Sequence, residues 1–305
     1  MGTVIKFILL FISFKTICAQ EIKNFNPDNV ENAVKRANKI VSGAIDNKCK
    51  EKSSTNKLLI NFTKLGGTPK ALKQALCFFN KHSNSKFYKK INGKLDKNVK
   101  TQIDNKDFIV IQDFTLPSNQ KRFFLLNLIT NEIKVYYSST GYGVENGYGI
   151  NMESHSKNFS NAKGSYLTPR GFLISAERHN GSSYAWKWHM KYDGVQKNLN
   201  DNSRDRLIVY HQGVKSDNFE NKIVPKGFAS STDLSPILRI TNSKGEEVSK
   251  YYNPQMYSNG CTTVSSEHVD EIYEKTKGRS LTYNFTQHEN ELGEDYCGDD
   301  SMVIK

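Results

Sequence analysis

Hydrophobic residues recur at two different spacings along the chain, and the change of spacing divides it into two regions. Apolar residues repeat at helical spacing over residues 28–41 and again over residues 68–79. The second of these segments opens with Thr-Pro, and proline suits the first turn of a helix. The polar stretch 81–105, rich in Lys and Asn, predicts a connecting loop. We therefore expect residues 20–104 to be a small helical accessory region.

From residue 105 onward the pattern changes to short apolar runs rich in β-branched and aromatic residues, which is typical of strands. Thr130-Asn131 separates two of these runs and predicts a hairpin, while residues 266–277 predict a helix. The expected strands are 108–111, 122–128, 132–137, 172–174, 207–210 and 280–285. The predicted fold class is therefore mainly β, with a β-rich domain at 105–288 preceded by the helical region.

Two further segments are expected to lie outside that compact domain. Residues 215–255, with several Pro and Asn, predict an insertion that forms a lid or a wall of a cleft. Residues 289–305 are acidic at their start and predict a mobile tail.

The N-terminus is typical of an export signal. Lys6 gives a small basic region, an apolar stretch follows to Phe14, and Ala19 offers a small residue for cleavage. Cys18 raises a lipoprotein alternative, but the bulky Ile17 fits it poorly. We expect a signal peptide at 1–19, an exported protein, and no integral membrane span once the signal is removed, because no later run of about 20 apolar residues occurs.

Composition and charge exclude several classes of protein. The chain of 305 residues has 17 Phe and 15 Tyr, which argues against wholesale disorder. Its formal net charge is +12, which favours a polyanionic neighbour such as an acidic cell wall or membrane face. The lysines are scattered and form no periodic patch, so we expect no nucleic-acid partner. No metal-ligand spacing occurs among the histidines and cysteines, so no metal or cofactor is expected.

Four cysteines remain after signal cleavage, and one of them has a distinctive setting. Cys49, Cys77 and Cys297 can supply a disulfide in an oxidising compartment, as Cys49–Cys77 or as either of them with Cys297. Cys261 directly follows Gly260 and precedes the predicted helix, so free backbone N–H groups around it are expected to lower the pKa of its thiol and to hold an oxyanion.

A nucleophilic cysteine also needs a base, and His211 ends an apolar strand that would aim its imidazole. The alternative from the residues alone is that Cys261 is half of a disulfide and that His211 is a surface residue.

Several short motifs occur in a fixed order along the chain. They are Phe159-Ser160-Asn161 with Gly164-Ser165, the stretch Thr168 to Phe172, the stretch Gly194 to His211, and Ser258-Asn259-Gly260-Cys261. Together they resemble the catalytic domain of the L,D-transpeptidase (YkuD-type) family, in particular its murein L,D-transpeptidase subfamily. The resemblance covers about residues 123–285. It implies a β-rich domain with the cysteine and the histidine facing each other in a cleft.

The resemblance also implies roles for individual residues. Cys261 would be the nucleophile and His211 the base, Ser258 would orient the imidazole through its carbonyl, and the N–H groups of Gly260 and Cys261 would form the oxyanion hole. Arg206 would either steady its loop or meet a substrate carboxylate.

The chain departs from the family pattern at three places. Ser138 to Gly141 stand where the subfamily has His-Gly, Asn259 stands where many members have His or Arg, and Thr263 stands where many have Arg or Asn. Asn259 and Thr263 are therefore candidate substrate-binding positions whose recognition of a substrate carboxylate is in question.

The sequence thus predicts an exported cysteine-dependent L,D-transpeptidase that acts on peptidoglycan stem peptides through a thioester, in the periplasm or envelope of a bacterium. Two alternatives remain open. One is an L,D-carboxypeptidase that trims stem peptides, and the other is a non-catalytic cell-wall-binding protein.

Overall fold

The computed structural model describes residues 55–118, 120–144, 149–151, 155–180, 188–213, 223–225, 237–241, 247–251 and 257–299. The predicted signal peptide, the predicted helix at 28–41 and Cys49 lie outside these residues. From Thr55 onward the chain forms one compact unit.

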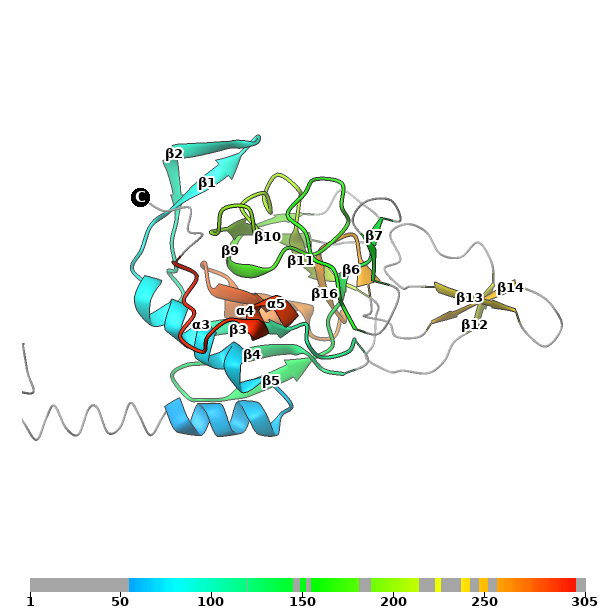
Figure 1. The fold of residues 1–305 in the computed structure, drawn as a ribbon, viewed down its shortest axis with the longest axis horizontal. Coiled ribbons are helices and arrows are strands. Elements are labelled where there is room, and N and C mark those ends of the chain that lie inside the picture. The colour runs from blue at the N-terminus through cyan, green and yellow to red at the C-terminus, as the bar shows by residue number, and fades with distance from the viewer. Residues whose placement is uncertain are drawn as a thin grey trace, which may run out of the picture. The chain divides into compact units, whose positions relative to one another are not determined.

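The centre of this unit is an eight-stranded sheet, which confirms the predicted mainly β fold class (Figure 1). Across the sheet the strands are β16 (Thr262–Val264), β11 (Val209–Gln212), β10 (Trp188–Gly194), β9 (Gly171–Asn180), β17 (Leu281–Phe285), β3 (Phe108–Asp113), β4 (Phe123–Asn127) and β5 (Ile133–Tyr136). Neighbouring strands are antiparallel except at β11–β16 and β17–β3. The predicted hairpin around Thr130-Asn131 is the antiparallel pair β4–β5.

Both faces of the sheet are buried, which explains why the sequences of its strands are continuous apolar runs. Along β3, Ile109 and Ile111 belong to one hydrophobic cluster while Val110 belongs to the other. Helix α3 (Pro69–His82) packs with the first cluster and helix α4 (Val269–Thr276) with the second. Side chains of successive strand residues point to opposite faces, so one run supplies both cores.

Helix α3 confirms the helix predicted after Thr68-Pro69, and residues 55–64 are also helical. Because α3 shares a core with the sheet, this part of the predicted accessory region packs directly on the β-rich domain. The division at 104/105 stays a prediction.

The predicted loop at 81–105 is wrong over most of its length. The chain there forms an antiparallel hairpin of β1 (Phe87–Ile91) and β2 (Lys94–Thr101). Its turn is Asn92-Gly93, and both residues have positive φ, 51° and 75°. Asn-Gly is the preferred pair for a two-residue hairpin turn, so the signal was present within the polar stretch.

The expectation of a mobile tail from residue 289 is also wrong as far as residue 299. Helix α5 (Gln287–Glu291) begins with a capping box between Thr286 and the buried Glu289. Beyond it, Lys73 pairs with Glu294 at 2.6 Å, and Cys77 forms a disulfide with Cys297. The acidic side chains therefore anchor this segment to the basic face of α3.

The predicted insertion at 215–255 contains a three-stranded antiparallel sheet of β12 (Ile223–Pro225), β14 (Glu247–Tyr251) and β13 (Ile237–Thr241). Two small strand pairs lie elsewhere: β6 (Thr140–Gly141) with β15 (Tyr257–Ser258), and β7 (Gly143–Val144) with β8 (Gly149–Ile150). Among the described helices, none has the length and apolar character needed to cross a membrane.

Reduction of the Cys77–Cys297 disulfide is expected to destabilise the folded protein by about 2–4 kcal/mol, because the bridge closes a loop of 220 residues in the unfolded chain. For a protein of this size that is a fall in the midpoint of thermal unfolding of about 5–15 °C. Thermal unfolding with and without reductant measures it. A Cys77→Ser variant should show the same fall and no further response to reductant; equal midpoints for all samples would contradict the prediction.

Candidate active site

The strand order brings Cys261, which directly precedes β16, beside the strand that carries His211. β11 and β16 pair in parallel, with His211 opposite Thr263. Cys261 precedes Thr263 by two residues, which is one full period of a strand, so it continues the face to which Thr263 and His211 belong. Both side chains are buried, and Cys261 is a free thiol, so the alternative of a disulfide at Cys261 is excluded.

The loop before Cys261 is held by its own hydrogen bonds. Ser258 Oγ donates to the carbonyl of Cys261 at 2.5 Å and accepts the N–H of Gly260 at 3.1 Å. Gly260 has φ +104°, and a Cβ there would lie 2.9 Å from the carbonyl oxygen of Leu167, so only glycine fits. The residue type at Gly260 is thus fixed by close backbone approach.

Two groups that were expected to act on the substrate or on the imidazole form hydrogen bonds within the protein instead. The Gly260 N–H, expected to be a free donor, is bonded to Ser258 Oγ. The carbonyl of Ser258, expected to orient the imidazole, accepts the N–H of Tyr142 at 2.9 Å. Ser258 therefore acts on the shape of the cysteine loop. The roles of these groups toward substrate stay predictions.

Sequence reasoning missed a second group that holds the loop, although the segment stands out as a departure from the family. Ser139 Oγ donates to the Cys261 carbonyl at 3.2 Å and accepts the N–H of Thr263 at 3.0 Å. The Ser139 N–H in turn donates to the Thr263 carbonyl at 3.1 Å. Thr263 is buried and tied to Ser139, whereas Asn259 is exposed beside the nucleophile loop.

The pKa of the Cys261 thiol also differs from the sequence-based prediction, and that of His211 is shifted as well. Burial raises the pKa of the Cys261 thiol to about 11, and the Arg206 charge offsets this only in part. The predicted lowering of the thiol pKa is therefore wrong, because loss of hydration disfavours the thiolate more than the neighbouring donors favour it. Burial likewise lowers the pKa of His211 to about 4. The resting pair is a neutral thiol and a neutral imidazole.

The hydrogen bond of the imidazole fixes which nitrogen can act as a base. His211 Nδ1 lies 2.6 Å from the carbonyl oxygen of Gln212. Since a carbonyl only accepts, Nδ1 carries the proton and Nε2 is left with the lone pair. The thiol of Cys261 itself donates to the carbonyl of Leu207 at 3.5 Å.

Arg206 is held by neutral oxygens from one loop. It donates to the carbonyls of Ser160 and Leu167, each at 2.5 Å, and to Ser165 Oγ at 3.0 Å. Of the two predicted roles, these bonds favour steadying the loop. A role toward a substrate carboxylate stays a prediction.

Two tyrosines beside the site were not predicted. Tyr142 and Tyr166 stack with ring centroids 5.9 Å apart and planes 7° from parallel, and both are partly exposed. Tyr166 has φ +52°, an uncommon conformation for a bulky residue, and its carbonyl accepts the N–H of Gly143. The signal in the sequence was the Gly/Tyr loop at 141–149.

Within the described ranges no three His, Cys, Asp or Glu side chains gather as metal ligands would.

Comparison with known families gives a match over part of the chain. The model of the L,D-transpeptidase catalytic domain family matches residues 79–227, which confirms the resemblance. The match includes His211 and ends before Cys261. The match supports a catalytic function of the L,D-transpeptidase type, and the enzyme class that it supports is a transpeptidase or peptidase. A search of curated proteins found no match.

Proposed function

We propose that the protein is an exported cysteine-dependent L,D-transpeptidase that acts on peptidoglycan stem peptides through a thioester acyl-enzyme. The observation that carries the proposal is the free thiol of Cys261 directly before β16, the strand paired with β11, on which His211 holds its proton on Nδ1 and can accept one on Nε2. The family match supports the reaction class, because it describes an L,D-transpeptidase catalytic domain.

In the first step of the proposed reaction the Cys261 sulfur attacks the carbonyl that joins an L-configured stereocentre to a terminal D-amino acid. His211 Nε2 takes the thiol proton as the C–S bond forms, because the raised thiol pKa and the lowered imidazole pKa disfavour transfer beforehand. The imidazolium then returns this proton to the departing amine. The C–N bond breaks, the D-amino acid leaves, and a thioester remains.

In the second step an amine of a neighbouring stem peptide attacks the thioester and gives up its proton through His211. The C–N bond that forms is the cross-link, and the thiol is restored. Backbone N–H groups of the cysteine loop would hold the negative charge of each tetrahedral intermediate. For the Gly260 N–H this requires release from Ser258 Oγ, so a small shift of the loop on substrate binding is part of the proposal.

The proposed location is the periplasm or cell envelope of a bacterium. It is supported by the signal-like segment at 1–19 and by the formal net charge of +12, which favours retention on an acidic wall polymer.

The products separate this function from the two alternatives. Incubation of the purified protein with isolated stem peptides should give cross-linked dimers by mass, each dimer accompanied by one released D-amino acid. Trimmed monomers alone would instead identify an L,D-carboxypeptidase, in which water resolves the thioester. No product, with Cys261 shown to be reduced, would identify a non-catalytic wall-binding protein and overturn the proposal.

A further inference from the structure

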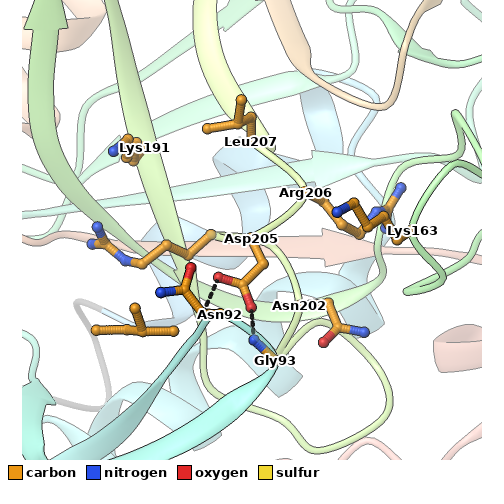
Figure 2. Close-up of a pocket in the computed structure, with 10 residues that line it drawn as sticks. Asn92, Gly93, Lys163, Lys191, Asn202, Asp205, Arg206 and Leu207 are labelled. Atoms are coloured by element: carbon orange, nitrogen blue, oxygen red, sulfur yellow. Dashed lines mark hydrogen bonds between the residues drawn. The ribbon is translucent and has the colours of Figure 1, made fainter.

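A pocket of ≈ 740 Å³ lies where the tip of the β1–β2 hairpin meets the segment that leads into β11 (Figure 2). Its volume is within the range of about 300–1,000 Å³ that is usual for ligand sites. Its lining includes four cations, one carboxylate and one exposed apolar side chain, which are Lys163, Lys191, Arg204, Arg206, Asp205 and Leu207. The hairpin that forms one wall replaces the loop expected from the sequence.

This wall is fixed to the rest of the domain. Asp205 accepts the backbone N–H groups of Asn92 and Gly93 at 2.8 and 2.6 Å, bonds that Figure 2 shows as dashed lines. Further along the hairpin, Lys89 pairs with the buried Asp193 at 3.0 Å. The pocket is therefore a built cavity, and its one lining carboxylate is engaged by the turn.

The lining is rich in positive charge, with four cationic side chains against that one carboxylate. Arg204 is compensated, because it binds Glu177 with both terminal nitrogens and Asp193 with Nε. Lys191 lies 3.8 Å from Glu177, a long pair. Lys163 is exposed, and the ion pairs found among the described residues do not include it. Lys163 and Lys191 are therefore the two lysines of the lining whose positive charge is little compensated by a carboxylate, so both can contact an anionic ligand.

The positions of the two lysines indicate an extended ligand. In Figure 2, Lys191 and Lys163 lie on opposite sides of Asp205 and Asn92. A ligand that contacts both lysines would have to span the lining between them. The side-chain amides of Asn92 and Asn202 stand in the lining between, and amides both donate to and accept from a peptide backbone.

Leu207 connects the pocket to the candidate nucleophile. Its side chain lines the pocket and is 59% exposed, and its φ is +55°, which is rare for leucine. Its carbonyl accepts the hydrogen bond from the Cys261 thiol at 3.5 Å. Strained backbone of this kind clusters at functional sites, and here one residue borders both the pocket and the thiol.

We propose that this pocket binds a peptide that carries at least two separated carboxylates, with Lys163 and Lys191 contacting one carboxylate each. The existence of this binding site is inferred from the pocket and its lining alone. Its role rests on the proposed function: the peptide held there is the second stem peptide, whose amine resolves the thioester at Cys261.

The test is binding of two acetylated peptides of equal length, tetraglutamate and tetraglutamine, to the full chain by titration calorimetry at physiological salt. Tetraglutamate should bind, and tetraglutamine should bind at least tenfold more weakly. Lys163→Gln and Lys191→Gln should each weaken tetraglutamate binding about three- to tenfold, since each removes one charged contact. Lys163→Arg should retain binding, because it keeps the charge.

Lys64→Gln is the matched control, since Lys64 is an exposed lysine on the helix at 55–64 and loses the same charge. Equal binding of the two peptides, or equal weakening by Lys64→Gln and Lys163→Gln, would overturn the pocket assignment. Inorganic phosphate that competes as well as tetraglutamate would also overturn it in favour of a general anion site. Binding is measured without turnover, so loss of thioester chemistry with binding intact would overturn the proposed function alone.

Discussion

Cys261→Ala will form no covalent adduct with a stem peptide, whereas the wild-type protein will gain the mass of the stem peptide less its terminal D-amino acid. The loss should be complete, because the alanine methyl group cannot attack a carbonyl and within the described residues Cys261 is the one free cysteine. Intact-protein mass spectrometry after rapid acid quenching measures the adduct, since a thioester is stable in acid.

Cys261→Ser is the control for packing, because serine nearly matches cysteine in size and can donate to the Leu207 carbonyl as the thiol does. It should also form no detectable adduct at neutral pH, since a buried hydroxyl ionises far less readily than a thiol. Both variants should unfold within a few degrees of the wild type, because the loop is held by Ser258 and Ser139. An adduct of the same mass on Cys261→Ala would place the nucleophile elsewhere.

The sheet could be predicted from sequence wherever strands are buried on both faces. The run Phe108–Asp113 lies between two cores, so its apolar character is continuous and unmistakable. The β1–β2 hairpin could be recognised only from Asn92-Gly93, because β2 is largely exposed and has no apolar run. Its position is set by long-range contacts of the hairpin with Asp193 and Asp205, and local sequence does not encode such pairs.

The identities of the candidate nucleophile and base were accessible from sequence, but their protonation states were not. The ordered motifs are sufficient to indicate Cys261 and His211. The direction of each pKa shift depends on burial, and burial is decided by how segments far apart in the sequence pack together, which local sequence does not report. The glycine before Cys261 and the helix predicted after it suggested a lowered thiol pKa, because these two features indicate only the N–H donors close to it in the sequence.

The same limit applies to the segment Ser138–Gly141. Its departure from the family pattern was visible in the sequence, yet its effect was not, because Ser139 meets Cys261 across more than a hundred residues of chain. The structure shows that this segment supports the cysteine loop through hydroxyl and backbone bonds. The segment that departs from the family pattern is therefore one that holds the cysteine loop in this chain.

His211→Gln is expected to lower the rate of acyl-enzyme formation by about 10²- to 10⁴-fold at pH 7, since that is the usual contribution of a positioned general base. The pH dependence should change as well. In the wild type the imidazole pKa of about 4 leaves the base neutral above about pH 5, so the rate at low substrate should be flat from there to pH 9 and fall as pH drops through 4. Single-turnover mass spectrometry at each pH measures this rate.

In His211→Gln only the thiolate can react, and its fraction rises tenfold for each pH unit until the thiol pKa of about 11. The variant should therefore gain rate steadily between pH 7 and 10 where the wild type does not, a difference that a purely structural defect would not produce. His179→Gln is the matched control, because His179 is exposed on β9 and should keep the flat profile.

Folding must be checked by circular dichroism at each pH. An unfolded histidine with its ordinary pKa of about 6.5 takes up a proton that buried His211 does not, so stability falls as pH drops from 6.5 toward 4. If His211→Gln retains the wild-type rate and a flat profile while folded, the imidazole does not act as the base. The thiol would then have to lose its proton to the substrate or to another group of the cysteine loop.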